Sequence, residues 1–353
     1  MSEAPPEHKQ VIGDDTVFKA KSATHKRRGL TCQVFKHGER LGQATNLTDI
    51  SDLLRHEDHL VWLDAVDPNQ EDLDLIKEEF GLHPLAVEDA VHAHQRPKIE
   101  TYGNTWFVVV QATTVEVDRI QFHEMAIFVG EQFLVTVRHT PALPLEEIEK
   151  RWNNHPEELR RGTGFLLYTI LDTVVDGYLP VAQRFEDRVD VLEEDLFRDR
   201  PMQREVLPRI FEMKREAQRF RWAAMPMRDI LNPIIRKDID IFPEDTLAYF
   251  RDVYDHAVRV IDQLDNVRDL VSSALEIHLS VISNRQNEVA KQLTIIATIF
   301  LPLTFLTGFF GQNFTLLVTH IITPAWTFWV FGIGLELLAL TLTLGYFKWK
   351  RWF

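Results

Sequence analysis

The sequence is poor in cysteine and has no excess of positive charge. One cysteine, Cys32, among 353 residues excludes an intrachain disulfide framework and a zinc finger with cysteine ligands. Lys and Arg number 39 against 53 Asp and Glu, and a net charge of -14 argues against a nucleic-acid partner, because such binders neutralise phosphates with basic residues. A Gly-rich phosphate loop is also missing, so no nucleotide partner is expected. No nucleophile–base arrangement is recognisable, so we expect no enzyme.

Formal charge is almost absent from one stretch near the C-terminus. Between Gln292 and Phe347 the only formally charged residue is Glu336. This stretch contains two apolar runs, Leu293–Phe310 and Ala325–Phe347. A helix needs roughly 20 apolar residues to cross the hydrocarbon core of a bilayer. The sequence therefore predicts two C-terminal transmembrane helices and contact with membrane lipid.

The distribution of basic residues predicts the orientation of these helices. Lys348, Lys350 and Arg351 follow the second apolar run, whereas the connecting loop Gly311–Pro324 contains neither Lys nor Arg. Positively charged segments remain on the cytoplasmic side. We therefore expect a multi-pass membrane protein with both termini in the cytoplasm.

The remaining sequence predicts a mixed α/β domain followed by helices. Strand-like runs alternate with helical stretches such as Glu71–Phe80. The strands are expected at Thr31–Phe35, His59–Ala65, Trp106–Thr113, Glu124–Val129 and Gln132–Val137. The expected division is a flexible segment 1–28, an α/β domain 29–143, a helical region 144–241, a long helix 242–311, an outer loop 312–324, a second span 325–347 and a basic tail 348–353.

The long helix has no glycine or proline from Glu244 to Leu301, and it continues into the first apolar run. Its apolar residues repeat in steps of three and four, which is typical of bundled helices. They are Leu247, Phe250, Tyr254, Ala257, Ile261 and Leu264. A helix of about 100 Å at 1.5 Å per residue needs neighbours along this seam, so we expect a symmetric oligomer.

A second periodic set lies on one face of the first apolar run. Its members are small, polar or Leu: Asn287, Ala290, Leu293, Ala297, Leu301, Thr304, Gly308 and Gly311. Ile295, Ile299, Leu303, Leu306 and Phe310 lie elsewhere on the helix. Small residues allow membrane helices to pack closely, but they also line narrow pores. The periodicity is compatible with both.

The first run ends in the motif Gly311-Gln312-Asn313. With the residues before it, this motif resembles the signature of the CorA family of divalent-cation channels, which ends in Gly-Met-Asn at the outer pore mouth. Further segments resemble landmarks of the same family in the same order: Trp62-Leu63-Asp64, the stretch from Phe80 to Asp89, the stretch from His94 to Lys98, the stretch from Tyr249 to His256 and the stretch from Ser283 to Val289.

The resemblance implies a homopentameric funnel in the inner (plasma) membrane, with a cytoplasmic α/β domain and a long stalk helix. It implies passive Mg2+ influx, with Co2+ and Ni2+ as further substrates. Mg2+ loses its water reluctantly, so neutral amide oxygens at the mouth suit its hydrated form. The pore and selectivity residues are expected to be Asn313, Gly311, Gln312, Thr304, Leu301, Ala297, Leu293 and Asn287. Of these, Leu293 and Leu301 would form apolar constrictions.

One residue departs from the family signature. Gln312 occupies the position of the family's Met, and relatives with Gly-Ile-Asn resemble zinc transporters of the ZntB type. A proton-coupled zinc carrier is therefore an alternative. Gln adds an amide oxygen, which favours hard cations, unless its side chain points away from the axis. A third alternative is a divalent-cation sensor that conducts no ions.

The resemblance also implies a sensor for intracellular Mg2+. An acid at the position of Asp89 in one subunit would face the acid at the position of Asp252 in the next, with metal between them and His256 and Glu88 nearby. Bound metal would clamp the subunits and close the pore. Without the resemblance, carboxylates spaced along a helix are usually solvated surface groups.

Two other features have competing explanations. His83, His92 and His94 are ligand types for Zn2+, but without a cysteine they are expected to be surface or helix-end residues. Glu336 lies within the second apolar run, where a carboxylate is a functional candidate. We expect instead a protonated carboxyl group that is hydrogen-bonded to a neighbouring helix.

Overall fold

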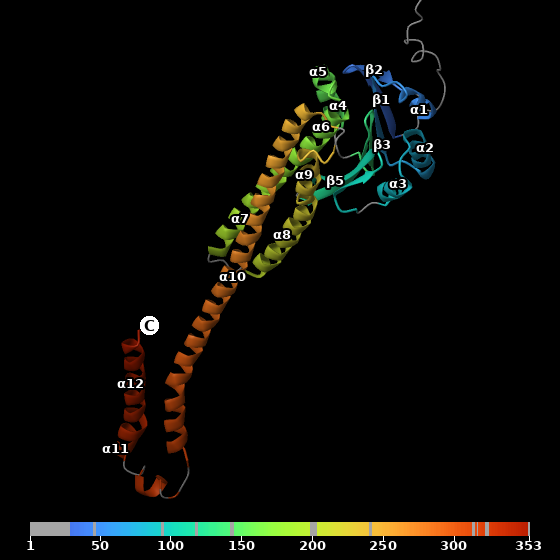
Figure 1. Ribbon diagram of the computed structural model, residues 1–353. Coiled ribbons are helices and arrows are strands. Elements are labelled where there is room, and N and C mark those ends of the chain that lie inside the picture. Colours follow the sequence, from blue (N-terminus) through green and yellow to red (C-terminus); the bar gives the residue numbers. More distant parts are fainter. Residues whose placement is uncertain are drawn as a thin grey trace, which may run out of the picture. The chain divides into compact units, whose positions relative to one another are not determined.

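The computed structural model describes residues 29–44, 47–92, 95–116, 119–141, 145–197, 203–239, 242–312, 315, 317–321 and 325–351 (Figure 1). The chain divides into two compact units, Met1–Ala274 and Leu275–Phe353. The expected N-terminal segment 1–28 and the residues His94 and Asn313 lie outside the described residues.

The first unit contains a seven-stranded sheet with the order β2-β1-β3-β7-β6-β5-β4. Its strands are β1 Leu30–Lys36, β2 Glu39–Gln43, β3 His59–Val66, β4 Lys98–Tyr102, β5 Thr105–Glu116, β6 Arg119–Val129 and β7 Phe133–Arg138. Neighbouring strands are antiparallel, except for the parallel pair β3 and β7. The predicted mixed α/β fold is confirmed, and each predicted strand is present.

Helices α2 (Gln70–Phe80) and α3 (Pro84–Val91) cover one face of the sheet (Figure 1). The short helices η2 (Leu47–Asp49) and α1 (Ile50–Leu53) precede them. Apolar residues from both helices pack with alternate strand residues in one buried cluster. Asn69 caps α2 by accepting from the backbone N–H of Asp72, and the carboxylate of Asp72 accepts from the N–H of Asn69. This capping box fixes where the helix begins.

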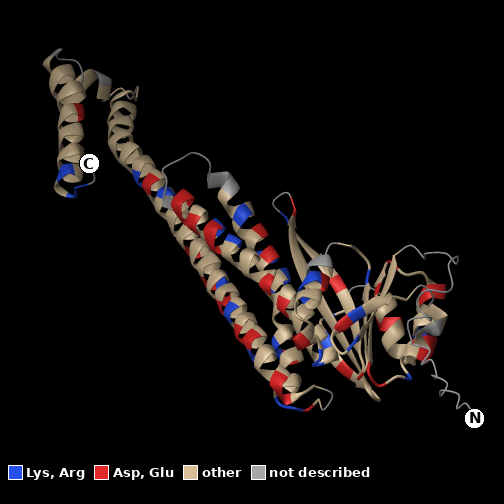
Figure 2. Cartoon of the chain, turned by 90° about the horizontal axis from the view of Figure 1, so that it is seen from above, with Lys and Arg blue, Asp and Glu red and all other residues tan. Residues whose placement is uncertain are grey.

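The opposite face of the sheet packs against helices from the second half of the unit (Figure 1). They are α4 Leu145–Asn154, α5 Pro156–Leu159, α6 Thr163–Asp176, α7 Tyr178–Phe197, α8 Gln203–Ala224 and α9 Pro226–Ile235. Figure 2 shows dense charge of both signs on α7 and α8. Arg209 of α8 lies 2.7 Å from Asp195 of α7, and Arg188 pairs with Glu216 between the same helices.

Trp152 of α4 is central to this second layer. It is fully buried, with edge-to-face contacts to Trp62 at 4.6 Å and to Phe35 at 6.5 Å between ring centroids. Its indole N–H donates to the hydroxyl of Thr169. We expect Trp152→Ala to lower the free energy of unfolding by about 3–5 kcal/mol, because it leaves a large cavity in the core. Denaturant unfolding of the full chain, with the exposed Trp222→Ala as control, measures the difference; a loss under about 1 kcal/mol would contradict this role.

The longest helix, α10, runs from Leu247 to Phe310 after a 3-10 turn, η3, at Glu244–Thr246. The seam residues predicted from its periodicity are buried within the same chain, apart from the half-buried Tyr254. Phe250, for example, packs against Phe242 at 5.5 Å and Tyr168 at 6.3 Å between ring centroids. Helices of its own unit therefore fill this seam, so the seam does not need other copies of the chain as its periodicity had suggested.

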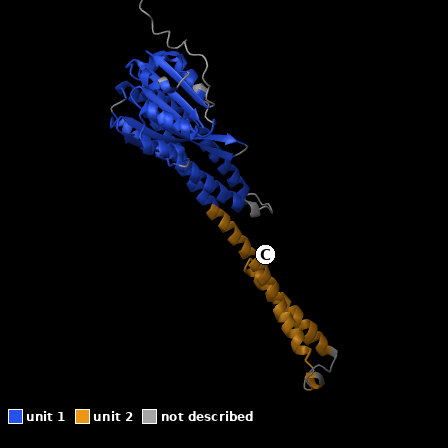
Figure 3. Cartoon of the chain, turned by 90° about the vertical axis from the view of Figure 1, so that its right-hand side faces the viewer, with its two compact units in different colours: residues 1–274 blue, residues 275–353 orange. Residues whose placement is uncertain are grey.

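The second unit contains two apolar segments, namely the end of α10 and the C-terminal stretch that follows it (Figure 3). Its remaining elements are η4 Leu317–Ile321, α11 Ala325–Thr327, η5 Phe328–Gly334 and α12 Leu335–Trp349. Pro302 lies inside α10 without ending the helix. Both η4 and η5 have π-helical geometry.

Three helical stretches in the described part of the chain are long and apolar enough to cross a membrane. They are Thr163–Leu196, Glu244–Phe310 and Phe328–Trp349. The apolar window of the first is 72% buried inside the chain, so it is a core segment of the α/β unit. The windows of the other two are not buried, and these stretches contain the predicted spans.

Candidate pore and metal sites

The predicted pore stripe lies on the exposed face of α10. Its described members are all exposed, and Leu293 and Leu301 have 67% and 70% of their surface accessible. The bulky residues Ile295, Ile299, Leu303, Leu306 and Phe310 are half-buried. The stripe residues are therefore more exposed than this bulky set, although Ile296, Phe300 and Phe305 of the same helix are exposed as well.

The hydroxyl group of Thr304 has a defined orientation within this stripe. It donates its proton to the backbone carbonyl of Phe300 at 2.8 Å. Thr294 and Thr298 make the same bond four residues back, at 2.8 and 2.7 Å. A hydroxyl oxygen that has donated its proton still has acceptor lone pairs. Thr304 can therefore accept a hydrogen bond from a water molecule in the shell of a cation.

At its C-terminal end, α10 leads into the predicted motif Gly311-Gln312-Asn313. Gly311 donates its backbone N–H to Thr307 at 2.9 Å, and Gln312 donates to Phe309 at 3.3 Å. A Cβ atom at Gly311 would lie 2.9 Å from the carbonyl oxygen of Thr307, so the close turn requires glycine there. Gln312 is exposed.

The two apolar segments meet near this end. Phe310 of α10 and Phe331 of η5 lie 6.3 Å apart between ring centroids. A cavity of about 260 Å³ is lined by residues of both segments: Thr307, Phe310, Gly311, Thr327, Phe328, Phe331 and Gly332. The end of α10 thus packs toward the second segment through Phe310 and Gly311, whereas the other stripe residues do not line this cavity.

Asp89, the predicted metal ligand of α3, has a cationic neighbour in its own chain. Its carboxylate lies 2.7 Å from the ammonium group of Lys98, which also contacts Glu100 at 2.8 Å. Burial acts to lower the pKa of Lys98, but the hydrogen bonds to Asp89 and Glu100 outweigh it, so the pKa is raised. Glu88, the adjacent candidate, is exposed. A metal ion at Asp89 must therefore compete with Lys98.

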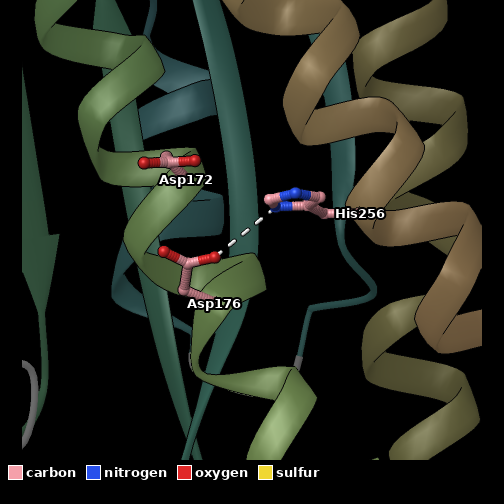
Figure 4. A group of neighbouring side chains, drawn as sticks. All are labelled: Asp172, Asp176 and His256. Carbon is pink, nitrogen blue, oxygen red and sulfur yellow. Dashed lines mark ion pairs between the residues drawn. The ribbon is translucent and has the colours of Figure 1, made fainter.

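His256 of α10 is brought close to two carboxylates of α6 (Figure 4). One ligand atom each of Asp172, Asp176 and His256 lies within 4.8 Å of the others. His256 Nδ1 is 3.6 Å from a carboxylate oxygen of Asp176, which is too long for a hydrogen bond, and this nitrogen is buried without a hydrogen-bond partner among the described residues. The group can hold a divalent cation through two oxygens and one nitrogen.

The two carboxylates of this cluster have different electrostatic environments. Asp172 is nearly buried and is paired with Arg151 at 2.7 Å. Burial raises the pKa of Asp176, and the neighbouring charge of Asp172 raises it further, whereas His256 acts to lower it. A raised pKa means that protons compete with metal at a higher pH than at an ordinary aspartate. The predicted ligand Asp252 is exposed and lies one helical turn before His256, outside the cluster.

The structure thus combines some of the predicted site residues and separates others. It places the described stripe residues on one exposed face, and it joins His256 to Asp172 and Asp176 rather than to Asp252. Sequence reasoning missed both aspartates, although two acids four residues apart at the end of the apolar helix α6 are a detectable signal. Among the described histidines, His83 caps α3 and His92 ends it, as expected for helix-end residues.

The chain has an α/β unit, one long continuous helix and two exposed apolar segments, one of which has a face of polar and small residues. This combination defines a class of membrane transport proteins. A family model described as "CorA-like Mg2+ transporter protein" matches residues 57–350. The chain belongs to this family, whose members are transporters or channels and not enzymes.

Individual relatives agree with this assignment. The chain is 33% identical over 319 residues to the "Cobalt/magnesium transport protein CorA" of Thermotoga maritima, covering 86% of this chain and 87% of the relative. A solved CorA magnesium transporter from Methanocaldococcus jannaschii has the same fold, with a TM-score of 0.74 at 23% identity, covering 92% of this chain and 98% of that one. The "Zinc transport protein ZntB" of Cronobacter sakazakii is 24% identical over 274 residues, 74% of this chain and 79% of the relative.

Proposed function

We propose that this protein transports divalent cations passively across the inner (plasma) membrane, with Mg2+ as the main substrate and Co2+ and Ni2+ as further substrates. The observation that carries this proposal is the exposed stripe on α10, in a chain that belongs to a Mg2+ transporter family. A face with amide, hydroxyl and small residues suits a water-filled path better than lipid.

The chemistry of the stripe fits an ion that keeps its water. Mg2+ prefers octahedral oxygen coordination and dehydrates reluctantly. Asn287, Thr304 and Asn313 offer neutral oxygens that accept hydrogen bonds from the inner water shell. Gln312, exposed at the end of the helix, offers another. Thiol and thioether ligands, which favour softer cations, are absent from the stripe.

A single stripe on one helix cannot enclose a path for ions. Several copies of α10 around an axis would, and the likeness to solved CorA transporters supports an oligomer. We propose a homopentamer with both termini in the cytoplasm, in which each copy contributes one stripe. The basic residues Lys348, Lys350 and Arg351 after α12 support the orientation.

We also propose that intracellular Mg2+ regulates the channel. Asp89 of one subunit and Asp252 of the next would share one metal ion, with Glu88 beside it. His256, together with Asp172 and Asp176, would hold a second ion within one subunit, as the geometry of the cluster supports. Bound metal would favour the closed state, and its loss would leave like charges that repel each other.

Ion uptake by purified protein in liposomes tests the proposed function. Mg2+, Co2+, Ni2+ and Zn2+ are offered together at equal concentration, and internal metal is measured over time with empty liposomes as the control. We expect Mg2+ to enter without an imposed pH gradient. Zn2+ uptake that exceeds Mg2+ uptake and follows a pH gradient would favour the zinc carrier, which the ZntB relative keeps as the second candidate. No flux of any ion would indicate a sensor.

The substitution Asp252→Lys is expected to weaken inhibition by internal Mg2+ severalfold. The change removes one carboxylate from the shared site and places a cation there, which opposes metal binding by simple charge repulsion. The measurement is the internal Mg2+ concentration that halves the uptake rate. Asp262→Lys, at another exposed position of the same helix, is the matched control and should leave this concentration unchanged. Unchanged inhibition in Asp252→Lys would remove Asp252 from the sensor.

A further inference from the structure

A second cavity, unrelated to the pore and to the metal cluster, lies within the first unit. It has a volume of about 510 Å³, which is in the usual range for sites of small organic ligands. Its walls come from the segment before β4, from β5 and β6, and from the end of α8. The lining residues are Gln95, Arg96, Pro97, Gln111, Phe122, Arg219, Arg221, Trp222, Met225 and Pro226.

The charge of this cavity is opposite to that of the chain. Its lining includes Arg96, Arg219 and Arg221 and no acidic residue, whereas the whole sequence has 53 Asp and Glu against 39 Lys and Arg. Arg96 and Arg219 are exposed and form no ion pair with another residue in the described ranges. Arg221 is held through its Nε by Asp265 of α10 at 3.0 Å. This leaves its remaining N–H donors available.

Aromatic and amide groups complete the lining. Trp222 has 67% of its surface accessible, an unusual exposure for the largest apolar side chain. Phe122, on β6, is half-buried in the same wall. Gln95 donates its side-chain N–H to the carbonyl of His92 at 3.4 Å, and Gln111 presents a second carboxamide. Planar rings stack on such aromatic faces, and carboxamides pair with the polar edges of heterocycles.

We propose that this cavity binds a nucleotide: an anion whose phosphates contact Arg96, Arg219 and Arg221 and whose base stacks on Trp222. Guanidinium groups bind phosphate oxygens in a bidentate manner, so they supply the contacts that a Gly-rich loop provides elsewhere. Such a ligand accounts together for the exposed guanidinium groups of Arg96 and Arg219, the unused donors of Arg221 and the exposed indole around one concave space. A nucleic acid is disfavoured, because the negative charge of the chain would repel a long polyanion.

Equilibrium dialysis of the full-length protein in detergent against labelled ATP tests this proposal. Free Mg2+ is held constant by a metal buffer, because ATP itself binds Mg2+. We expect saturable binding to the wild-type protein. Arg219→Gln should weaken ATP binding about tenfold or more, since it removes a charged hydrogen-bond partner. Trp222→Ala should weaken ATP binding at least about fivefold, yet leave the binding of inorganic triphosphate unchanged, since only the base stacks on the ring.

Arg215→Gln is the matched control, because Arg215 is an exposed residue of the same helix and does not line the cavity. It should bind ATP like the wild type, and Trp222→Phe should restore part of the affinity. Absence of ATP binding to the wild type, or equal binding by all variants, would overturn the proposal. A change of oligomeric state in the Trp222→Ala protein without any ATP binding would also overturn it, and would identify the cavity as a contact between copies.

Discussion

Replacing Asn313 with alanine is expected to lower the flux of every transported cation by at least about tenfold. If Asn313 forms a ring of amide oxygens at the pore mouth, each copy accepts hydrogen bonds from the water shell of the ion. A hydrogen bond to a charged group contributes about 1.5–3 kcal/mol, and 1.4 kcal/mol corresponds to a tenfold change in an equilibrium constant. Initial uptake rates in liposomes at low external Mg2+ measure the loss.

The matched control is Thr319→Ala, which removes another polar side chain from the segment after α10. Thr319 is exposed, and its hydroxyl donates to the carbonyl of Thr315 at 2.6 Å. This variant should transport ions at the wild-type rate. If the Asn313→Ala protein transports ions at the wild-type rate, the amide of Asn313 does not contribute to ion transport at the pore mouth. Loss of one cation alone would indicate direct coordination of that ion rather than of its water shell.

The fold could be predicted largely from local pattern. The strands β3 and β7 are mostly apolar runs, and the absence of glycine and proline from Glu244 to Leu301 indicated a long helix, which extends from Leu247 to Phe310. The strands that the pattern missed, β2 and β4, form the two edges of the sheet. Their side chains are exposed or half-buried, so no apolar run marks them. Edge strands depend on pairing with a neighbour, which no local window contains.

The site was predictable in one part only. The stripe on α10 repeats with the period of a helix, so the position of its members on one face follows from spacing alone. The cluster of Asp172, Asp176 and His256 joins residues 80 or more positions apart, and only packing of α6 against α10 brings them together. The same limit applies to Asp89, whose contact with Lys98 depends on the start of β4. Spacing along the chain describes faces of one element, whereas a metal site combines several.

A polar residue in place of Leu301, at the proposed apolar constriction, should raise the ion flux, whereas the loss of Asn313 should lower it. Leu301 is 70% exposed on the stripe face, and in an oligomer its side chains would form an apolar ring that resists water and ions when narrow. Asn at this position can hold water through its amide. We expect Leu301→Asn to conduct under inhibitory internal Mg2+ at least about tenfold faster than the wild type. Uptake at saturating internal Mg2+ measures this leak.

The control for this variant is Leu342→Asn, which places the same amide on α12 at a side chain that is 65% exposed. Because the proposed path lies along α10, Leu342→Asn should remain fully inhibited by internal Mg2+. Equal leaks in both variants would mean that the amide disturbs the membrane region in general. Tight closure of Leu301→Asn would place the gate elsewhere on the stripe, with Leu293 as the next position to test. The pair of variants thus distinguishes a pore along the stripe from a surface used only for helix packing.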